Sequence, residues 1–185
     1  MIICICGKSG SGKSTIAKLI QEEKNNSINI DIDKIGHQSH NDEKVKQELI
    51  TTFGEIILTN NSIDRKKLGK IVFSNKDDMK KLENITWNYM EQEIDKIINN
   101  NKDKIIILDW LLLPKTKYFN SSDLRILVDI PYEIRKKRVL KRDNITEKQF
   151  ELREKNTIEY DRNKFEYILE ENNIDKIKKK VLKYE

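Results

Sequence analysis

Residues 7–14, GKSGSGKS, are the stretch that decides which fold this sequence predicts. They match the pattern G-x-x-x-x-G-K-[S/T]. An apolar run, residues 1–6 (MIICIC), precedes the pattern, and residues 15–23 follow it with helical periodicity. A glycine-rich loop between a strand and a helix is the context in which this pattern binds phosphate. We therefore predict a nucleotide-binding loop, the alternative being a glycine-rich turn that matches by chance.

The residue types in this loop suit a triphosphate. Backbone N–H groups can surround a polyanion only where no Cβ blocks their approach, and Gly7, Gly10 and Gly12 allow this. The unpaired N–H groups of the following helix add the positive end of its dipole. Lys13 supplies a point charge for the β- and γ-phosphates, and the Ser14 hydroxyl can bind Mg²⁺. The expected ligands are ATP and Mg²⁺.

The composition of the chain suits a globular domain with a heavily charged surface. Hydrophobic residues make up 37% of the 185 residues and charged residues 36%, and no apolar run has the length of a membrane span. We interpret Cys4 and Cys6 as buried core residues of a cytoplasmic protein. The net charge of +5 is compatible with nucleic acid binding or with a lysine-rich surface around a phosphate site. Because many lysines lie on otherwise acidic helices, we favour the second and expect no nucleic acid partner.

Strands alternate with helices along the chain, a pattern that predicts an α/β layered fold. Two apolar runs, residues 104–109 (KIIILD) and 124–129 (LRILVD), are typical of strands buried on both faces of a parallel sheet. Strands are predicted over residues 1–6, 28–32, 104–109, 124–129 and 165–169. Helices are predicted over residues 15–23, 132–142, 147–160 and 174–182, and residues 42–99 are predicted to be helical without strands.

Three carboxylates are expected at strand ends, where ligands of such sheets collect: Asp31, Asp33 and Asp109. A kinase needs a carboxylate that orients or deprotonates the attacking hydroxyl, and often another near Mg²⁺. We assign the first role to Asp33 and the metal's outer shell to Asp31 or Asp109. The alternative for each is an aspartate that caps the next helix.

Three arginines, Arg135, Arg138 and Arg142, are spaced so that they share one face of a helix. Arginines that close over a transferring phosphoryl group stabilise its charge, and on a mobile lid they also exclude water. The alternative is a solvated helix face that pairs with Glu133 and Asp143.

His37 lies four residues after Asp33, on the same helix face if a helix begins there. It is either a surface histidine or a contact to the acceptor.

Taken together, these residues resemble the dephospho-coenzyme A kinase family over nearly the whole chain. Residues 31–37 (DIDKIGH) are similar to its D-A-D-x-I-A-H segment, and residues 63–73 (IDRKKLGKIVF) to its d-R-x-x-L-g-x-i-v-F pattern. Arg138 and residues 142–143 fall where the lid arginines of the family stand. Residues 168–172 resemble the closing strand before the adenine site.

The resemblance implies roles for individual residues, above all that Asp33 faces the acceptor ribose hydroxyl and that Arg65 contacts the acceptor. The expected catalytic residues are Lys13, Asp33, Arg138 and Arg142. The expected nucleotide contacts are Gly7, Gly10, Ser11, Gly12, Lys13, Ser14, Thr15 and Asn172. The expected acceptor contacts are Asp33, His37, Arg65, Trp87 and Asp109, and the expected metal contacts are Ser14 and Asp31.

The sequence departs from the family pattern at three places. Lys8 and Ser9 stand where Gly-Ile is usual, Trp87-Asn88 replace His-Pro, and residues 111–115 (LLLPK) replace P-L-L-x-E. Two alternatives therefore stay open. One is a kinase with a nucleoside, nucleotide or other small hydroxyl acceptor; the other is a nucleotide-binding regulator without transferase activity.

We therefore expect a P-loop NTPase-type three-layer fold with a five-stranded parallel sheet and helices on both faces. The single domain, 1–185, would have a core of 1–33 and 103–185, a helical acceptor-binding insertion at about 40–100 and a lid at about 135–160. The activity that the resemblance implies is ATP-dependent phosphorylation of the ribose 3′-hydroxyl of dephospho-CoA. We expect a monomer or weak homo-oligomer without a membrane partner.

Overall fold

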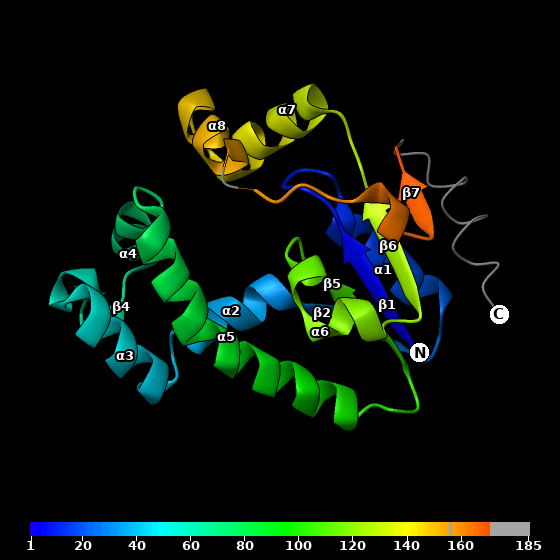
Figure 1. The fold of residues 1–185 in the computed structure, drawn as a ribbon, viewed down its shortest axis with the longest axis horizontal. Coiled ribbons are helices and arrows are strands. Elements are labelled where there is room, and N and C mark those ends of the chain that lie inside the picture. The colour runs from blue at the N-terminus through cyan, green and yellow to red at the C-terminus, as the bar shows by residue number, and fades with distance from the viewer. Residues whose placement is uncertain (156, 171–185) are drawn as a thin grey trace. The chain divides into compact units, whose positions relative to one another are not determined.

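The computed structural model describes residues 1–155 and 157–170, and it divides them into two compact units (Figure 1). The sheet unit comprises Met1–Asp31 and the described residues from Asn101 onward, and the helical unit comprises Ile32–Asn100. The predicted helix 174–182 and the expected nucleotide contact Asn172 lie outside the described residues.

The sheet unit is built on a five-stranded parallel sheet, as predicted. Its strands are β1 (Ile2–Cys6), β2 (Ser27–Asp31), β5 (Ile105–Asp109), β6 (Leu124–Val128) and β7 (Tyr167–Leu169). The spatial order is β2-β5-β1-β6-β7, and each neighbouring pair is parallel. The chain thus adds strands first on one side of β1 and then on the other. The crevice where the order reverses lies beside the carboxyl end of β1, where ligands of such sheets bind.

Helices cover both faces of this sheet. Alternate residues of β1 point to opposite sides, and the apolar side chains on each side are buried under helices. Ile3 and Ile5 pack with Ile16 and Ile20 of the first helix in one buried cluster. On the other face, the Cys4 thiol donates a weak hydrogen bond of 3.8 Å to the Tyr118 carbonyl. The helices of the unit are α1 (Lys13–Glu23), η2 (Leu113–Lys115), α6 (Lys117–Ser121), α7 (Tyr132–Asp143), α8 (Glu147–Lys155) and η3 (Arg162–Lys164).

The helical unit has a core of its own, which the side chains of Val45, Leu49, Ile57, Leu68 and Val72 form. Its elements are α2 (Ile32–Ser39), α3 (Glu43–Phe53), η1 (Glu55–Ile57), β3 (Leu58–Thr59), β4 (Ser62–Ile63), α4 (Arg65–Val72) and α5 (Lys76–Asn99).

The prediction that residues 42–99 contain no strand is wrong. β3 and β4 form a short antiparallel hairpin, in which Leu58 pairs with Ile63. Asn60 and Asn61 connect the strands with φ angles of 48° and 59°. Two successive residues with positive φ make the turn whose twist matches paired strands, and asparagine is among the few residues that adopt it at low cost.

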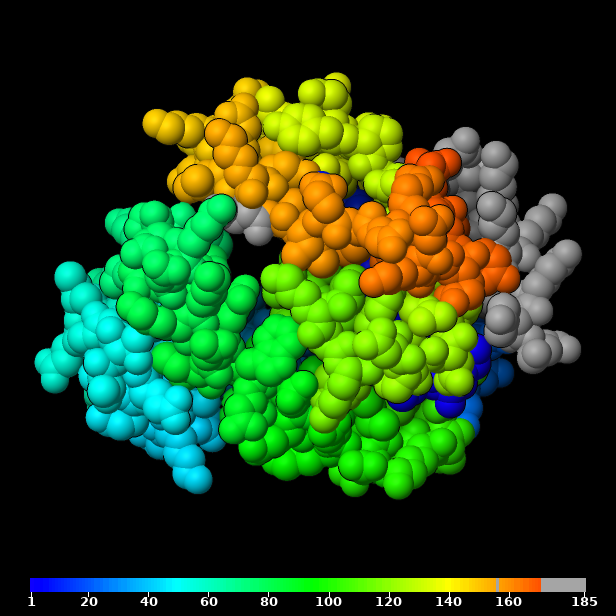
Figure 2. Space-filling model, viewed as in Figure 1, coloured from blue at the N-terminus to red at the C-terminus, as the bar shows by residue number. Residues whose placement is uncertain are grey.

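The predicted helix 147–160 is too long. α8 ends at Lys155, and Thr157–Tyr160 are not helical. This segment instead runs back along the sheet unit, where the Tyr160 hydroxyl donates a hydrogen bond of 2.9 Å to the Leu111 carbonyl. In the space-filling view the orange segment after α8 accordingly lies beside the light-green residues that follow β5 (Figure 2).

Within residues 1–155 and 157–170, no helix combines the length and the apolar character that crossing a membrane requires.

Candidate nucleotide and acceptor sites

The predicted phosphate loop connects β1 to α1 in the crevice of the sheet. Gly12 is the N-cap of α1 with a φ of 95°, and no side chain caps this helix end. The helix therefore presents backbone N–H groups that an anion can accept. Ser14 is exposed in the first turn, and Lys13 is half-buried there.

Two arginines of α7 hold the carbonyl groups of this loop. Arg135 donates from Nη1 to the Ser9 carbonyl at 3.3 Å, and Arg138 donates to the Gly10 carbonyl at 3.2 Å and the Ser11 carbonyl at 3.5 Å. In a trans peptide the N–H points away from the carbonyl of the same unit. The N–H groups of Gly10 and Gly12 are thereby turned away from α7, which gives the loop an anion-binding face.

Ser11 gives an independent sign that the loop fits a phosphate ligand. Its side chain is fully buried, and its hydroxyl oxygen makes no hydrogen bond within the described part of the chain. A buried polar group of this kind is costly unless a ligand or water satisfies it.

Gly10 is the position where the loop packs most closely on α7. Its φ is +78°, and a Cβ there would lie 2.7 Å from the Arg135 carbonyl oxygen and 2.8 Å from Cγ2 of Val139. Any side chain would push the loop away from the arginines that orient its carbonyls.

We expect Gly10→Ala to weaken ATP binding about tenfold or more, which corresponds to about 1.4 kcal/mol. Gly54→Ala is the matched control, because Gly54 has a φ of +79° but nothing within 4 Å of its Cβ position. Both variants lose stability through the strained φ, by about 1–2 kcal/mol. Isothermal titration calorimetry should show weaker ATP binding for Gly10→Ala alone. Equal ATP affinities would contradict the role of this close contact.

Arg135 does not belong to an exposed positive surface, contrary to the expectation that grouped it with Arg138 and Arg142. Its side chain is buried at 5% exposure, and it binds both carboxylate oxygens of Glu154 at 2.6 and 2.9 Å. It also donates to the Ile130 carbonyl at 3.0 Å. Burial raises the pKa of Glu154, but hydrogen bonding to Arg135 and the charges of Arg135 and Lys8 hold it below its usual value. Arg135 thus connects the loop, α7 and α8.

Arg138 and Arg142 lie beside the loop from the same helix. Arg138 is half-buried against the loop carbonyls, whereas Arg142 is exposed. Arg142 donates to Asp143 at 2.7 Å and to the Ser9 hydroxyl at 3.4 Å. The Arg142–Asp143 pair is the one that the solvated-face alternative named, and the contact to Ser9 keeps Arg142 next to the phosphate loop.

Two predicted carboxylates meet at the carboxyl edge of the sheet. Asp31 ends β2 and Asp109 ends β5, and the two residues are partners in the register of these strands. Asp109 is also in register with Ile5 of β1, two residues before the phosphate loop. It is 3% exposed. No group of three or more His, Cys, Asp or Glu side chains that could hold a metal is found in residues 1–155 and 157–170.

The helical unit holds the other predicted acceptor residues. Asp33 lies in the first turn of α2, and both Asp33 and His37 are exposed on this helix, whereas Ile32 and Ile35 are buried. Arg65, at the start of α4, donates to the His37 carbonyl at 3.4 Å. The structure thus brings His37 and Arg65 together. Trp87 is half-buried in α5.

His40 lies next to His37 and Arg65, although no sequence pattern pointed to it. Burial lowers the pKa of His40 to about 4, with further contributions from the charges of Arg65 and His37. His40 is therefore neutral near pH 7, and Arg65 carries a positive charge beside it.

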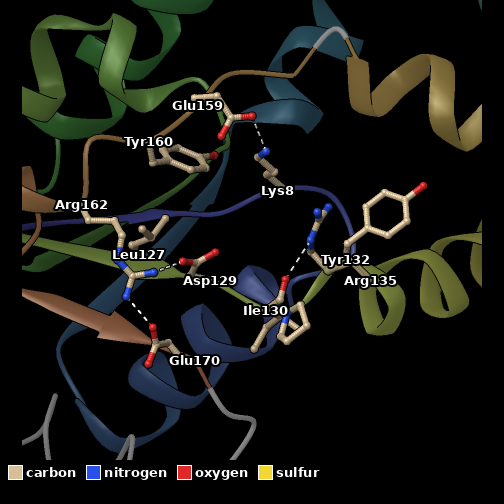
Figure 3. A pocket seen from close by; sticks show the side chains of 11 residues that line it. Lys8, Leu127, Asp129, Ile130, Tyr132, Arg135, Glu159, Tyr160, Arg162 and Glu170 are labelled. Atoms are coloured by element: carbon tan, nitrogen blue, oxygen red, sulfur yellow. Dashed lines mark hydrogen bonds and ion pairs between the residues drawn. The ribbon is translucent and has the colours of Figure 1, made fainter.

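A pocket of about 470 Å³ opens beside the phosphate loop, within the sheet unit (Figure 3). Pro131 and Tyr132 form part of its wall. Arg162 lies in it between two carboxylates, Asp129 and Glu170, and binds both. The pocket thus combines a few apolar side chains with several charged ones.

Lys8 and the segment after α8 form a contact that the sequence did not predict. Lys8 Nζ lies 2.7 Å from Glu159 and 3.6 Å from Glu154. Tyr160 lies next to this pair and binds the loop backbone at Gly7. No periodic signal marks these residues, because they contact the loop from a non-helical segment.

Comparisons with known proteins agree with this geometry. The family model described as dephospho-CoA kinase matches residues 1–176. A dephospho-CoA kinase of Aquifex aeolicus is 38% identical over 154 residues, which cover 82% of this chain and 77% of that protein. One of Fusobacterium nucleatum is 36% identical over 146 residues, covering 78% and 75%. The crystal structure of TT1252 from Thermus thermophilus superposes with a TM-score of 0.83 at 25% identity, over 99% of this chain and 94% of that one.

Proposed function

We infer the function from one premise, that the chain belongs to the dephospho-CoA kinase family. It is an ATP-dependent kinase that phosphorylates dephospho-CoA in coenzyme A biosynthesis. The observation that carries this conclusion is the family match over residues 1–176, which includes the phosphate loop and the helical unit. The hydroxyl that we propose as acceptor is the 3′-hydroxyl of the ribose.

We propose that the sheet unit binds ATP with its phosphates on the loop. The N–H groups of Gly10 and Gly12 would bind the phosphate oxygens, and the Lys13 ammonium would lie against the β- and γ-phosphates. Arg138 and Arg142 of α7 would neutralise charge that develops on the transferring group. The pocket beside Pro131 and Tyr132 would take the purine base.

A magnesium ion suits the oxygen groups at this site. Mg²⁺ prefers hard oxygen ligands, keeps several waters and usually takes one or two protein ligands together with substrate phosphates. The exposed Ser14 hydroxyl and the Asp31 carboxylate are such groups. When bound, the ion would draw charge from the β- and γ-phosphates.

We propose that the helical unit supplies the acceptor groups. Asp33 would accept a hydrogen bond from the ribose 3′-hydroxyl and take its proton as the hydroxyl oxygen bonds to the γ-phosphorus. The bond between that phosphorus and the bridging oxygen breaks at the same time, and ADP leaves. Arg65 would bind an anionic part of the acceptor. It is exposed, and its charge adds to the effect of burial in lowering the pKa of the neighbouring His40.

ADP release measured over a small acceptor panel tests this function. With dephospho-CoA, ATP and Mg²⁺ we expect turnover at least about a hundredfold above that with adenosine, AMP or shikimate. These three acceptors lack the pantetheine arm, so the binding energy of contacts to that arm is not available to the reaction. Excess EDTA should abolish the activity, and added Mg²⁺ should restore it. Comparable rates with a nucleoside would favour the nucleoside-kinase alternative. Nucleotide binding without turnover of any acceptor would favour the regulator.

A further inference from the structure

The Tyr160 side chain binds the phosphate loop from the segment that follows α8. Its hydroxyl accepts a hydrogen bond from the Gly7 N–H at 3.1 Å and donates one to the Leu111 carbonyl at 2.9 Å. Gly7 follows β1 and Leu111 lies just beyond β5, so one hydroxyl connects the ends of two neighbouring strands. Because a hydroxyl has a single proton, donation to Leu111 leaves a lone pair for Gly7.

Both contacts are partly buried. Burial is the main reason that the pKa of Tyr160 is raised well above its usual value. Its ring packs edge-on against Phe165 at 5.9 Å, and Phe165 in turn packs against Phe119 at 5.3 Å. The ring is therefore held by packing, and the hydroxyl forms its hydrogen bonds with the two backbone groups.

Gly7 is packed tightly against the phosphate-binding part of the loop, so the position of one depends on the other. A Cβ at Gly7 would lie 2.5 Å from the Val128 carbonyl oxygen and 2.6 Å from the Ser11 hydroxyl oxygen. The Gly7 backbone is thus packed between the end of β6 and the buried Ser11. If the Gly7 N–H lost its partner, the backbone would have to move to find another, and Ser11 and the neighbouring amides would move with it.

We propose that Tyr160 is a positioning residue for the phosphate loop, which fixes the loop entry so that its N–H groups meet the nucleotide phosphates. The proposal rests on the proposed use of ATP by this loop. It adds a residue from outside the loop sequence, and it makes nucleotide affinity depend on the segment after α8. Tyr160 has no expected contact with the acceptor, so its effect should be confined to the nucleotide.

The test is Tyr160→Phe, which removes only the hydroxyl and keeps the packed ring. The N–H of the buried Gly7 and the carbonyl of the half-buried Leu111 would each lose a partner, and leaving such groups unsatisfied carries a penalty that grows with burial. Expressed as affinity, we expect the Kd for the non-hydrolysable ATP analogue AMP-PNP, measured calorimetrically with Mg²⁺, to rise about tenfold. The KM for dephospho-CoA should stay within about twofold, and the KM for ATP should rise with the Kd.

Tyr89→Phe is the matched control, because it removes the same atom from a partly buried tyrosine of the helical unit. It should leave the Kd for AMP-PNP unchanged. Thermal unfolding of both variants separates positioning from stability. If Tyr160→Phe lowers the unfolding temperature while its AMP-PNP affinity stays within twofold of the parent, Tyr160 is a packing residue and the proposal is overturned.

The parent protein distinguishes this inference from the proposed function. Suppose that the parent binds AMP-PNP in a Tyr160-dependent manner but releases no ADP with dephospho-CoA. The acceptor assignment then fails, and the positioning role of Tyr160 is supported. If the parent turns over dephospho-CoA and Tyr160→Phe does so with unchanged KM for ATP, the reverse holds.

Discussion

Replacing Lys13 by Ala is expected to lower kcat/KM for ATP about a thousandfold. Lys13 is the first residue of α1, directly after Gly12, so we expect its ammonium to lie against the phosphates. Charge on the transferring group increases in the transition state, and removing one group that stabilises such charge costs about 10²–10³-fold in rate. Because a full positive charge is lost, we place the effect at the upper end of this range, mostly in kcat.

Lys18→Ala provides the control for this experiment. Lys18 is an exposed lysine of the same helix, so it removes equal charge and equal side-chain length away from the loop. Steady-state ADP release at saturating dephospho-CoA measures both variants. A loss of less than about tenfold for Lys13→Ala would remove Lys13 from the catalytic set.

Asp33→Asn is expected to lower turnover of dephospho-CoA about a hundredfold or more while ATP binding stays intact. The amide has nearly the shape of the carboxylate, but it cannot accept the proton of the attacking hydroxyl. Asp33 lies in α2 of the helical unit, and the phosphate loop belongs to the sheet unit. The loss should therefore appear in kcat with dephospho-CoA and not in the Kd for AMP-PNP.

Glu48→Gln makes the same chemical change at an exposed carboxylate of α3, in the same unit as Asp33. It should leave kcat unchanged. Turnover of Asp33→Asn at the parent rate would show that another group accepts the proton. A parallel loss of AMP-PNP affinity would point instead to a misfolded variant.

The sheet could be predicted because its signals are local. The loop pattern is explained by phosphate binding. The apolar runs before Asp109 and Asp129 are explained by burial in a parallel sheet. The hairpin β3–β4 was missed because two-residue strands carry no periodicity, and their only signal is the pair Asn60-Asn61.

The site was predicted less completely, because several of its contacts join residues far apart in the chain. Arg135 has the spacing of an exposed lid arginine, yet its partner Glu154 is nineteen positions away and draws it into the interior. Tyr160 lies in a polar stretch that was expected to be helical. Its contact with Gly7, across 153 positions, depends on where α8 ends, and no sequence pattern specifies that point.

The arginines behind the phosphate loop have a thermodynamic consequence for ligand capture. The carbonyl oxygens of residues 9–11 accept hydrogen bonds from α7, within the protein itself. The loop therefore lost its backbone freedom when the chain folded, and an arriving nucleotide does not have to order it again. Association is spared that entropic penalty, so the binding entropy should reflect mainly released water and the immobilised ligand.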